Sequence, residues 1–326
     1  MRRLLLTAAA ATAAALALSA CGTTEPAADK AENKAAAHIT LTGASGTKVE
    51  LDGPAKKVVG TEWNVVEHLV SLGVAPVGVA DVKGYTSWDK SAPLTGSPKD
   101  IGTRGEPSMD TVAALAPDLI VATSDLPPAA IKQLRKIAPV LDLKAADAAD
   151  PIGQTYNDLD MIAKATGTTA RATELKKGFE TKLAEGKQQL AKAGHAGEKF
   201  AFADGYVTGN QVSIRPYTSG SLLGAVNEKL GLKNPWTMKG DPAYGLATTD
   251  VEGLTKLGDV QFAYIASDDD KGSKPFTGEL AGNAVWKSLP FVKANKVHRL
   301  PDGVWMFGGT ASMESYVDSV VAALTK

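Results

Sequence analysis

The chain has 326 residues, of which 44% are hydrophobic, and its 35 Lys and Arg are nearly balanced by 36 Asp and Glu. This balance gives no sign of nucleic-acid binding, and the hydrophobic fraction is ordinary for a globular protein. Removal of the first 20 residues leaves about 306. That exceeds the size at which one hydrophobic core usually stops growing, so we expect two lobes.

The first 20 residues have the pattern of a secretory signal peptide. Arg2 and Arg3 give a positive start, and residues 4–20 form an apolar run that contains neither an acidic nor a basic residue. A membrane-spanning helix is the alternative, but the run is short for a span of about 20 residues and no charged stop-transfer cluster follows it. We therefore interpret residues 1–20 as a signal peptide that is cleaved.

Cys21 is the only cysteine of the chain and directly follows this apolar run, in the sequence Leu-Ser-Ala-Cys-Gly. The sequence resembles the bacterial lipobox, and this resemblance implies that Cys21 receives a diacylglyceryl group before cleavage. A lone exported cysteine can instead be a reactive or intermolecular thiol. The position of Cys21 at the end of the run favours lipidation, which leaves the folded part without a disulfide.

Residues 22–37 are rich in Ala and in charged residues and show no hydrophobic periodicity. Such a segment cannot bury enough apolar surface to fold, so we expect residues 21–37 to be a lipidated flexible linker, with folded structure from about His38. The protein is then expected outside the cytoplasm, held on the outer face of the cell membrane by its lipid. A Gram-positive host, which has no outer membrane to retain the protein, would need this tether most.

Short apolar strands alternate with helical segments in the first half of the folded part, which favours a parallel α/β sheet. We assign residues 38–167 to an N-terminal lobe. The predicted strands are 56–60, 77–79, 119–121 and 140–143, and the predicted helices are 65–72, 108–116, 129–137 and 152–166.

A long helical pattern follows at residues 169–193, rich in Lys, Glu and Ala, and we interpret 168–194 as a helix that connects the lobes. A helix lacks the loop positions that absorb large dihedral changes, so little hinge motion is expected. A second α/β set then defines a C-terminal lobe, residues 195–326. Its predicted strands are 200–202, 212–214, 262–265 and 297–300, and its predicted helices are 221–230 and 312–324.

The two lobes share a local pattern at residues 108–120 and 250–260. Each segment has an acid on the first turn of an expected helix, Asp110 in one and Glu252 in the other, followed by apolar helical residues and a strand. An acid in this position complements the helix dipole, which is sufficient to explain it for stability.

Four segments, 58–81, 100–110, 283–292 and 303–309, closely resemble the ferric-siderophore substrate-binding proteins of ABC importers, a class III periplasmic binding protein family. Within that family the chain is most similar to the ferric-hydroxamate binders. The resemblance covers nearly the whole chain from about residue 55. It implies two α/β lobes joined by a single long helix, with a ligand cleft between them. It also implies a receptor without enzyme activity that binds a ferric siderophore such as a ferrioxamine and delivers it to an ABC permease.

The resemblance assigns ligand-binding residues. Arg104 matches the ligand-contacting arginine of a Gly-x-Arg-x-Glu-Pro motif, and the planar donors of arginine can fork onto hydroxamate oxygens. The alternative for Arg104 is an exposed salt bridge. A second donor is Arg215, and Tyr217 follows it closely in the same segment. The remaining ligand-binding candidates are aromatic, and for each of them core packing is the alternative: Trp63, Trp88, Tyr244, Trp305 and Phe307.

Three positions depart from the family pattern. Phe307 stands where the enteric-type hydroxamate binders have a tyrosine, and residues 125–127 replace aromatic pocket residues of that group. Asp110 replaces a more usual glutamate. In the family an acid at this position on each lobe docks onto arginines of the permease, so Asp110 and Glu252 are the expected docking residues. The siderophore holds its own iron, so we expect no cofactor and no metal ligands from the protein, which we expect to be a monomer.

Other functions remain as alternatives. The same fold can bind cobalamin, haem or a catecholate siderophore. A bare-metal receptor needs convergent His and carboxylate ligands, whereas His38, His68, His195 and His298 are scattered without ligand spacing. A lipid-anchored hydrolase would need a motif such as Gly-x-Ser-x-Gly or His-Glu-x-x-His, and the sequence contains neither.

Overall fold

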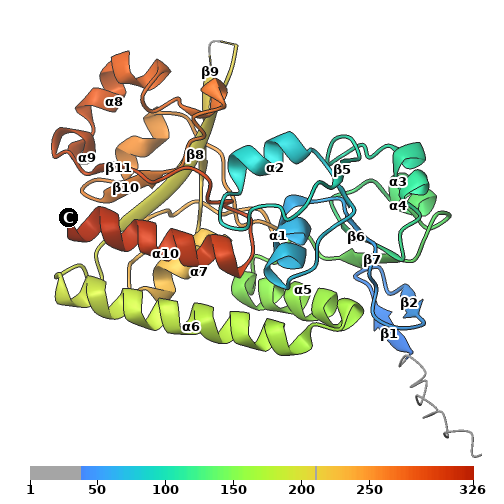
Figure 1. Ribbon diagram of the computed structural model, residues 1–326. Coiled ribbons are helices and arrows are strands. Elements are labelled where there is room, and N and C mark those ends of the chain that lie inside the picture. Colours follow the sequence, from blue (N-terminus) through green and yellow to red (C-terminus); the bar gives the residue numbers. More distant parts are fainter. Residues whose placement is uncertain (1–37, 210) are drawn as a thin grey trace, which may run out of the picture. The chain divides into compact units, whose positions relative to one another are not determined.

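The N-terminal lobe is built on a five-stranded parallel sheet. The computed structural model describes residues 38–209 and 211–326 (Figure 1), so the predicted signal peptide, Cys21 and the predicted linker lie outside the described residues. The strand order is β5-β4-β3-β6-β7, and every neighbouring pair is parallel. The strands are β3 (Val58–Gly60), β4 (Gly78–Val79), β5 (Lys99–Asp100), β6 (Leu119–Thr123) and β7 (Val140–Leu143).

Helices cover both faces of this sheet, which explains why its central strands β3 and β6 are continuous buried runs of mostly apolar residues. Val58, Leu119 and Val121 pack on one face in a common core with α1 and α5, and Val59 and Ile120 pack on the other face against α3 and α4. The helices are α1 (Trp63–Ser71), α2 (Val82–Trp88), α3 (Met109–Leu115), α4 (Pro128–Leu134) and α5 (Pro151–Thr166). A hairpin of β1 (Ile39–Thr42) and β2 (Lys48–Leu51), which is not among the elements predicted from the sequence, precedes the sheet.

The C-terminal lobe has a four-stranded sheet of order β11-β10-β8-β9. Strand β9 is antiparallel to β8, from which only two residues separate it in the chain, and the other two neighbouring pairs are parallel. The elements are β8 (Phe200–Thr208), β9 (Gln211–Pro216), β10 (Gln261–Tyr264), β11 (Val297–Arg299), α7 (Leu222–Lys229), α8 (Ala284–Ser288), α9 (Pro290–Lys293), α10 (Thr310–Thr325) and the 3-10 helices η1 (Glu252–Lys256), η2 (Lys271–Ser273) and η3 (Glu279–Gly282).

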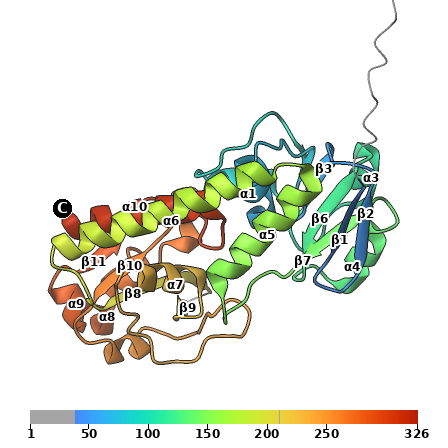
Figure 2. The same cartoon turned by 90° about the horizontal axis from the view of Figure 1, so that it is seen from below.

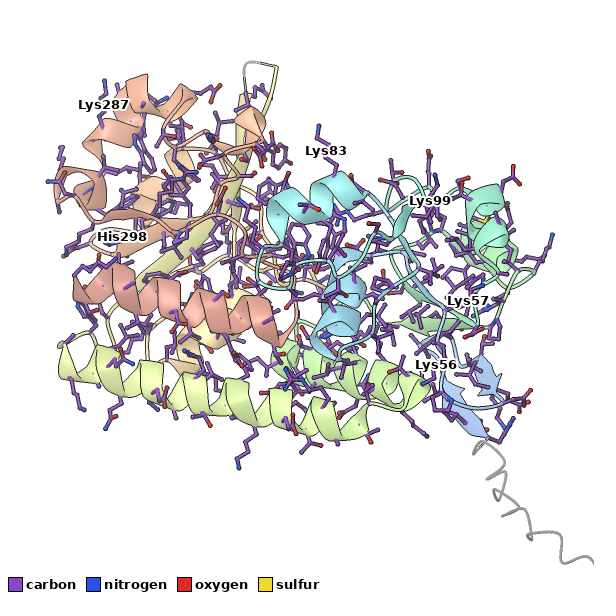
Figure 3. The ribbon with its side chains drawn as sticks, in the orientation of Figure 1. Lys56, Lys57, Lys83, Lys99, Lys287 and His298 are labelled. Atoms are coloured by element: carbon purple, nitrogen blue, oxygen red, sulfur yellow. The ribbon has the colours of Figure 1, made fainter. Side chains whose placement is uncertain are left out.

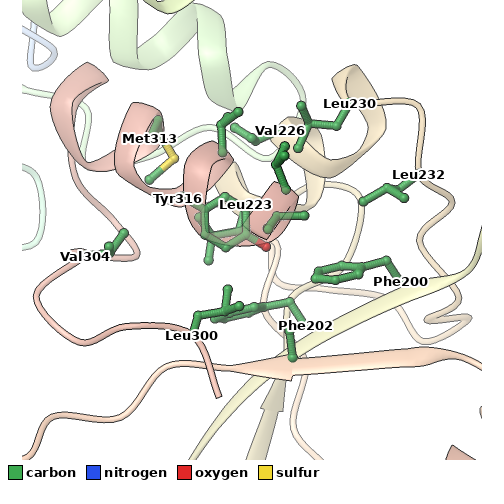
Figure 4. Packing of buried hydrophobic residues seen from close by; sticks show 14 of the residues in the cluster. Phe200, Phe202, Leu223, Val226, Leu230, Leu232, Leu300, Val304, Met313 and Tyr316 are labelled. Carbon is green, nitrogen blue, oxygen red and sulfur yellow. The ribbon is translucent and has the colours of Figure 1, made fainter. Parts of the chain in front are cut away.

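One core of the C-terminal lobe lies between this sheet and helices α7 and α10, and a second lies on the other face of the sheet against η1, α8 and α9. Figure 4 shows Phe200 and Phe202 of β8 facing Leu223 of α7 and Tyr316 of α10. Tyr316 is fully buried, and its hydroxyl donates to Asn227 Oδ1 at 3.1 Å. This packing holds the amino-terminal end of α10, and the segment before it, in a fixed position.

Helix α6 (Thr169–Lys192) connects the lobes and runs alongside α10 (Figures 1 and 2). Ala172 near its start packs in the N-terminal core, whereas Phe179 and Leu183 pack in the C-terminal core. Helix α5 also reaches across the boundary, with Ile152 in the C-terminal core and Leu159 in the N-terminal core. The predicted fold class, two α/β lobes joined by a long helix, is confirmed, and both lobes belong to one compact unit, Ala36–Lys326.

Within residues 38–209 and 211–326, none of the helices is both long and apolar enough to cross a membrane.

Candidate functional site

A cavity of about 240 Å³ lies between the two lobes, and we refer to it as the cleft. The N-terminal lobe contributes polar residues to it, and the C-terminal lobe contributes one arginine and mostly aromatic or apolar residues. Its lining consists of Glu62, Asn64, Arg104, Asp125, Arg215, Tyr244, Leu246, Trp305 and Phe307.

The topology of the sheets explains why these residues meet. Glu62 follows β3, Arg104 follows β5 and Asp125 follows β6. In an open parallel sheet the carboxyl ends of the strands share one edge, and ligands bind in the crevice outside that edge. In the other lobe Arg215 lies near the end of β9, and Trp305 and Phe307 lie between β11 and α10.

Arg104 is held by one carboxylate and two indole rings. Its Nη1 donates to Glu62 Oε1 at 2.7 Å, and Glu62 Oε1 also accepts from the backbone N–H of Trp63, at the amino-terminal end of α1. The Arg104 guanidinium lies 4.1 Å from the centroid of the Trp63 ring and 5.4 Å from that of Trp305. These cation–π contacts and the ion pair fix the guanidinium plane. The side chain is still 37% exposed, so it can donate to a ligand in the cleft.

Arg215 is held more tightly than Arg104. Its Nε donates to Asp204 Oδ1 at 2.8 Å, its Nη2 donates to Asp204 Oδ2, and Tyr217 donates to the same Oδ2 at 3.2 Å. Burial alone would lower the pKa of Arg215, but the hydrogen bonds to Asp204 and the charges nearby outweigh it and raise this pKa above its usual value. The guanidinium therefore stays charged and lies 5.8 Å from the Phe307 ring centroid.

The predicted aromatic residues divide into two groups. Tyr244, Trp305 and Phe307 line the cleft, with ring centroids 5.1 Å apart for Trp305 and Phe307 and 5.5 Å apart for Tyr244 and Phe307. Trp63 and Trp88 pack edge-on against Trp305 from behind, at 4.7 and 6.2 Å. In this arrangement the edge-to-face contacts fix the orientation of the Trp305 ring.

Tyr217 lies beneath the cleft instead of on its wall. The residue is 1% exposed, and its hydroxyl is used by Asp204. It therefore supports the Asp204–Arg215 pair and offers almost no surface to a ligand. Its position two residues after Arg215 predicts a ligand contact, but the structure packs it in the core of the C-terminal lobe.

A hydrogen bond crosses the cleft from one lobe to the other. Tyr244 donates its hydroxyl proton to Asp125 Oδ2. Burial, together with this hydrogen bond, raises the pKa of Tyr244, so the phenol stays protonated. Asp125 and Glu62 were missed as site residues. The signal that could have found them is their position directly after apolar strands of one parallel sheet.

Glu67 joins the lobes at the seam below the cleft. Its Oε1 accepts from the Ser312 backbone N–H at 2.9 Å and its Oε2 accepts from Ser312 Oγ at 2.8 Å. Glu67 on α1 thus caps the first turn of α10, where the N-cap residue Gly309 has no side chain to do so. Burial raises the pKa values of both Asp89 and Glu67, and their proximity raises that of Asp89 further, so this pair of carboxyl groups holds a proton at neutral pH. These contacts anchor the segment that carries Trp305 and Phe307.

The two expected docking acids lie on different kinds of helix. Asp110 is exposed on the first turn of α3, which Ser108 caps. Glu252 is also exposed, and the predicted helix that it begins is η1, a 3-10 helix of five residues. Glycine residues at 253 and 258 disfavour a longer helix there.

His195 and His298 belong to one hydrogen-bonded chain that runs through Glu198 and Gln261. His298 on β11, labelled in Figure 3, donates its Nε2–H to Gln261 Oε1 at 2.7 Å, and His195 pairs with Glu198. His68 is buried in α1, and burial lowers its pKa to about 4, so it is neutral. Among the described residues, no three His, Cys, Asp or Glu side chains are grouped so that they could hold a metal ion.

Comparisons with known proteins agree with this architecture. A family model described as a periplasmic binding protein matches residues 58–304. The chain is 29% identical over 278 residues to the Fe(3+)-citrate-binding protein YfmC of Bacillus subtilis (strain 168), covering 84% of this chain and 82% of that protein. It is 25% identical over 262 residues to the iron(3+)-hydroxamate-binding protein FhuD of Escherichia coli (strain K12), covering 80% and 84%. The solved structure of the siderophore-binding protein FhuD from Vibrio cholerae with bound Fe3+–Desferal matches with a TM-score of 0.73 and 25% identity, covering 83% of this chain and 98% of that one.

Proposed function

The chain belongs to the periplasmic binding protein family, and from this premise we propose that it is an extracytoplasmic substrate-binding protein for iron uptake. It binds a ferric siderophore in the cleft and delivers it to an ABC permease. The names of its relatives in Bacillus subtilis and Escherichia coli are those of iron-binding proteins, which supports a role without catalysis.

We further propose that the siderophore is of the hydroxamate type. The observation that carries this step is that each cleft arginine already has a carboxylate partner, Glu62 for Arg104 and Asp204 for Arg215. Asp125 adds a third carboxylate, and no lysine lines the cleft among the described residues. In Figure 3 the labelled Lys83 and Lys287 project outward from α2 and α8. The cleft therefore offers directed donors without a net positive charge.

The charge of the ferric complex then decides which ligand fits. Three singly charged hydroxamates cancel the charge of Fe(III), so a trihydroxamate complex is neutral, or cationic when it carries an amine. Three catecholates, or two citrates, leave the complex anionic. Because a like charge in a partly desolvated site opposes binding, the cleft favours the neutral or cationic complex. The aromatic wall of Trp305, Phe307 and Tyr244 supplies apolar contact area for a bulky ligand of this kind.

Two further parts of the proposal concern the membrane. The lipobox at Cys21 would tether the receptor to the cell surface and raise its effective concentration near the permease. Asp110 and Glu252, one on each lobe and both exposed, would dock onto the permease. Charge reversal of both acids should abolish siderophore-dependent uptake by cells and leave ligand affinity unchanged. Uptake at the wild-type rate would rule out this docking role.

Ligand titration tests the ligand class. Tryptophan fluorescence should be quenched as the cleft fills, because Trp305 lines it and Trp63 and Trp88 contact Trp305. Ferrioxamine B and ferrichrome are titrated beside a ferric tricatecholate, ferric citrate, haem and cobalamin, with metal-free siderophore as the control. We expect the hydroxamates to bind at least about 100-fold more tightly than the anionic complexes, a difference of about 2.7 kcal/mol. Tightest binding of any other ligand in the panel would overturn the hydroxamate assignment.

A further inference from the structure

A second, smaller cavity of about 40 Å³ lies behind the cleft, and we refer to it as the rear chamber. It shares the residues Asn64, Tyr244 and Phe307 with the cleft, so these three side chains form the partition between the two spaces. A water molecule needs about 10–15 Å³ of such volume. The rear chamber therefore has room for a few water-sized groups, such as the end of an unbranched chain, but not for a second bulky complex.

Asp158 of α5 is the most unusual residue of this chamber, because it is a carboxyl group that is 3% exposed and has no cationic partner among the described residues. Its Oδ1 accepts from Gln154 Nε2 at 2.8 Å. In the part of the chain that the structure describes, no hydrogen bond or ion pair reaches its Oδ2. A buried carboxylate is costly unless it is paired and fully hydrogen-bonded. One of its two oxygens is thus available to an incoming donor.

The other titratable groups of the rear chamber do not supply that charge. His68 from α1 is neutral because burial lowers its pKa to about 4. The Tyr217 and Tyr244 pKa values are raised by burial, so both are neutral phenols. Asp147, from the loop before α5, is already bonded to Lys144 Nζ at 2.5 Å, and that hydrogen bond lowers its pKa. The chamber therefore contains acceptors for a cation and no cation of its own among the described residues.

We propose that the rear chamber is a subsite for the primary ammonium group at the end of a linear hydroxamate siderophore, with Asp158 as its counter-ion. This inference rests on the proposed function and narrows the ligand class to linear complexes that carry a free amine. The ferric centre stays in the cleft against Arg104 and Trp305. A methylene arm passes the partition at Asn64 and Phe307, and its ammonium donates to the free oxygen of Asp158 and to Gln154 Oε1.

The pH dependence follows from the carboxyl group. Burial raises the pKa of Asp158 to about 8, so in the free protein it is mostly protonated at neutral pH. A bound ammonium favours the ionised form and must displace that proton. The advantage of an amine-bearing ligand is therefore greatest above about pH 8 and declines as the pH falls below it, whereas a ligand without the amine shows no such decline.

The experiment compares ferrioxamine B, which has one free primary amine, with its N-acetylated form, from about pH 6 to about pH 8.5. We expect the wild-type protein to prefer the amine form by about 10- to 100-fold at the upper pH, the range of a charge-assisted hydrogen bond. Asp158→Asn should remove this preference and leave the affinity for the acetylated form unchanged. Asp160→Asn is the matched control, because Asp160 lies on the same helix but is exposed and pairs with Lys176.

The outcomes separate the two proposals. If wild-type protein binds both forms equally at every pH, or if Asp158→Asn keeps the preference, the subsite is wrong while hydroxamate binding stands. If neither form binds, the proposed function itself fails and the subsite with it. Should Asp158→Asn not fold, the pH series on the wild-type protein decides alone, because a preference that does not decline toward pH 6 contradicts the role of Asp158.

Discussion

The two arginines of the cleft differ in how much of each is left for a ligand. Arg104 donates one hydrogen bond to Glu62 and makes cation–π contacts with two indole rings, and its side chain is 37% exposed. Arg215 gives two nitrogens to Asp204, whose second oxygen also accepts from Tyr217. The first is a positioned donor, and the second is mainly part of the wall. A ligand that needs a forked donor should therefore depend on Arg104 more than on Arg215.

The largest expected effect is on ligand affinity. Arg104→Ala should weaken ferrioxamine binding by about 100-fold, because it removes charge-assisted hydrogen bonds worth about 1.5–3 kcal/mol. Arg215→Ala should weaken it by about tenfold, since most of its donors are already engaged. Fluorescence titration of folded protein measures both. Equal losses of affinity for the two variants would show that the ion pairs with Glu62 and Asp204 do not determine which arginine donates to the ligand.

The second prediction tests the same difference through stability. Asp204→Ala should lower the free energy of unfolding by about 2 kcal/mol, because it leaves the Arg215 guanidinium and the Tyr217 hydroxyl without their partner. This loss is smaller than for a fully buried ion pair, because the Arg215 side chain is about one third exposed to water. Glu62→Ala should cost at most about 1 kcal/mol, since Arg104 can turn to water. Urea unfolding followed by circular dichroism gives both values. A larger loss for Glu62→Ala would reverse our ranking of the two pairs.

The sequence predicted each arginine but neither of its partners. Buried strands such as β3 and β6 are evident from the sequence as short apolar runs, and α6 is evident as a long uninterrupted helical pattern. The ion pairs are not evident, because Arg104 meets Glu62 across 42 positions and the two lie after different strands of the sheet. Pairing of this kind depends on strand order, which local pattern does not contain.

Tyr217 and the β1–β2 hairpin show two other limits of sequence reasoning. An aromatic residue at the end of a strand can face either the cleft or the core, and only the packing of Phe202, 4.9 Å from the Tyr217 ring, fixes the inward choice. The hairpin strands are four residues long, and β2 alternates between exposed and buried positions. Such short alternation is a weak signal beside an Ala-rich linker.

The smallest expected effect concerns Asp125, the cleft carboxylate that lacks an arginine. Asp125→Asn keeps an oxygen acceptor for the Tyr244 hydroxyl and removes one negative charge from the wall. The affinity for ferric citrate should then rise by about threefold at low salt, as expected for one charge in a largely hydrated site, and the gain should shrink at high salt. The affinity for the neutral ferrichrome complex should stay the same. If both ligands gain equally, Asp125 acts through Tyr244 and the position of the lobes; if only the anion gains, the unpaired acid is part of what makes this cleft select by charge.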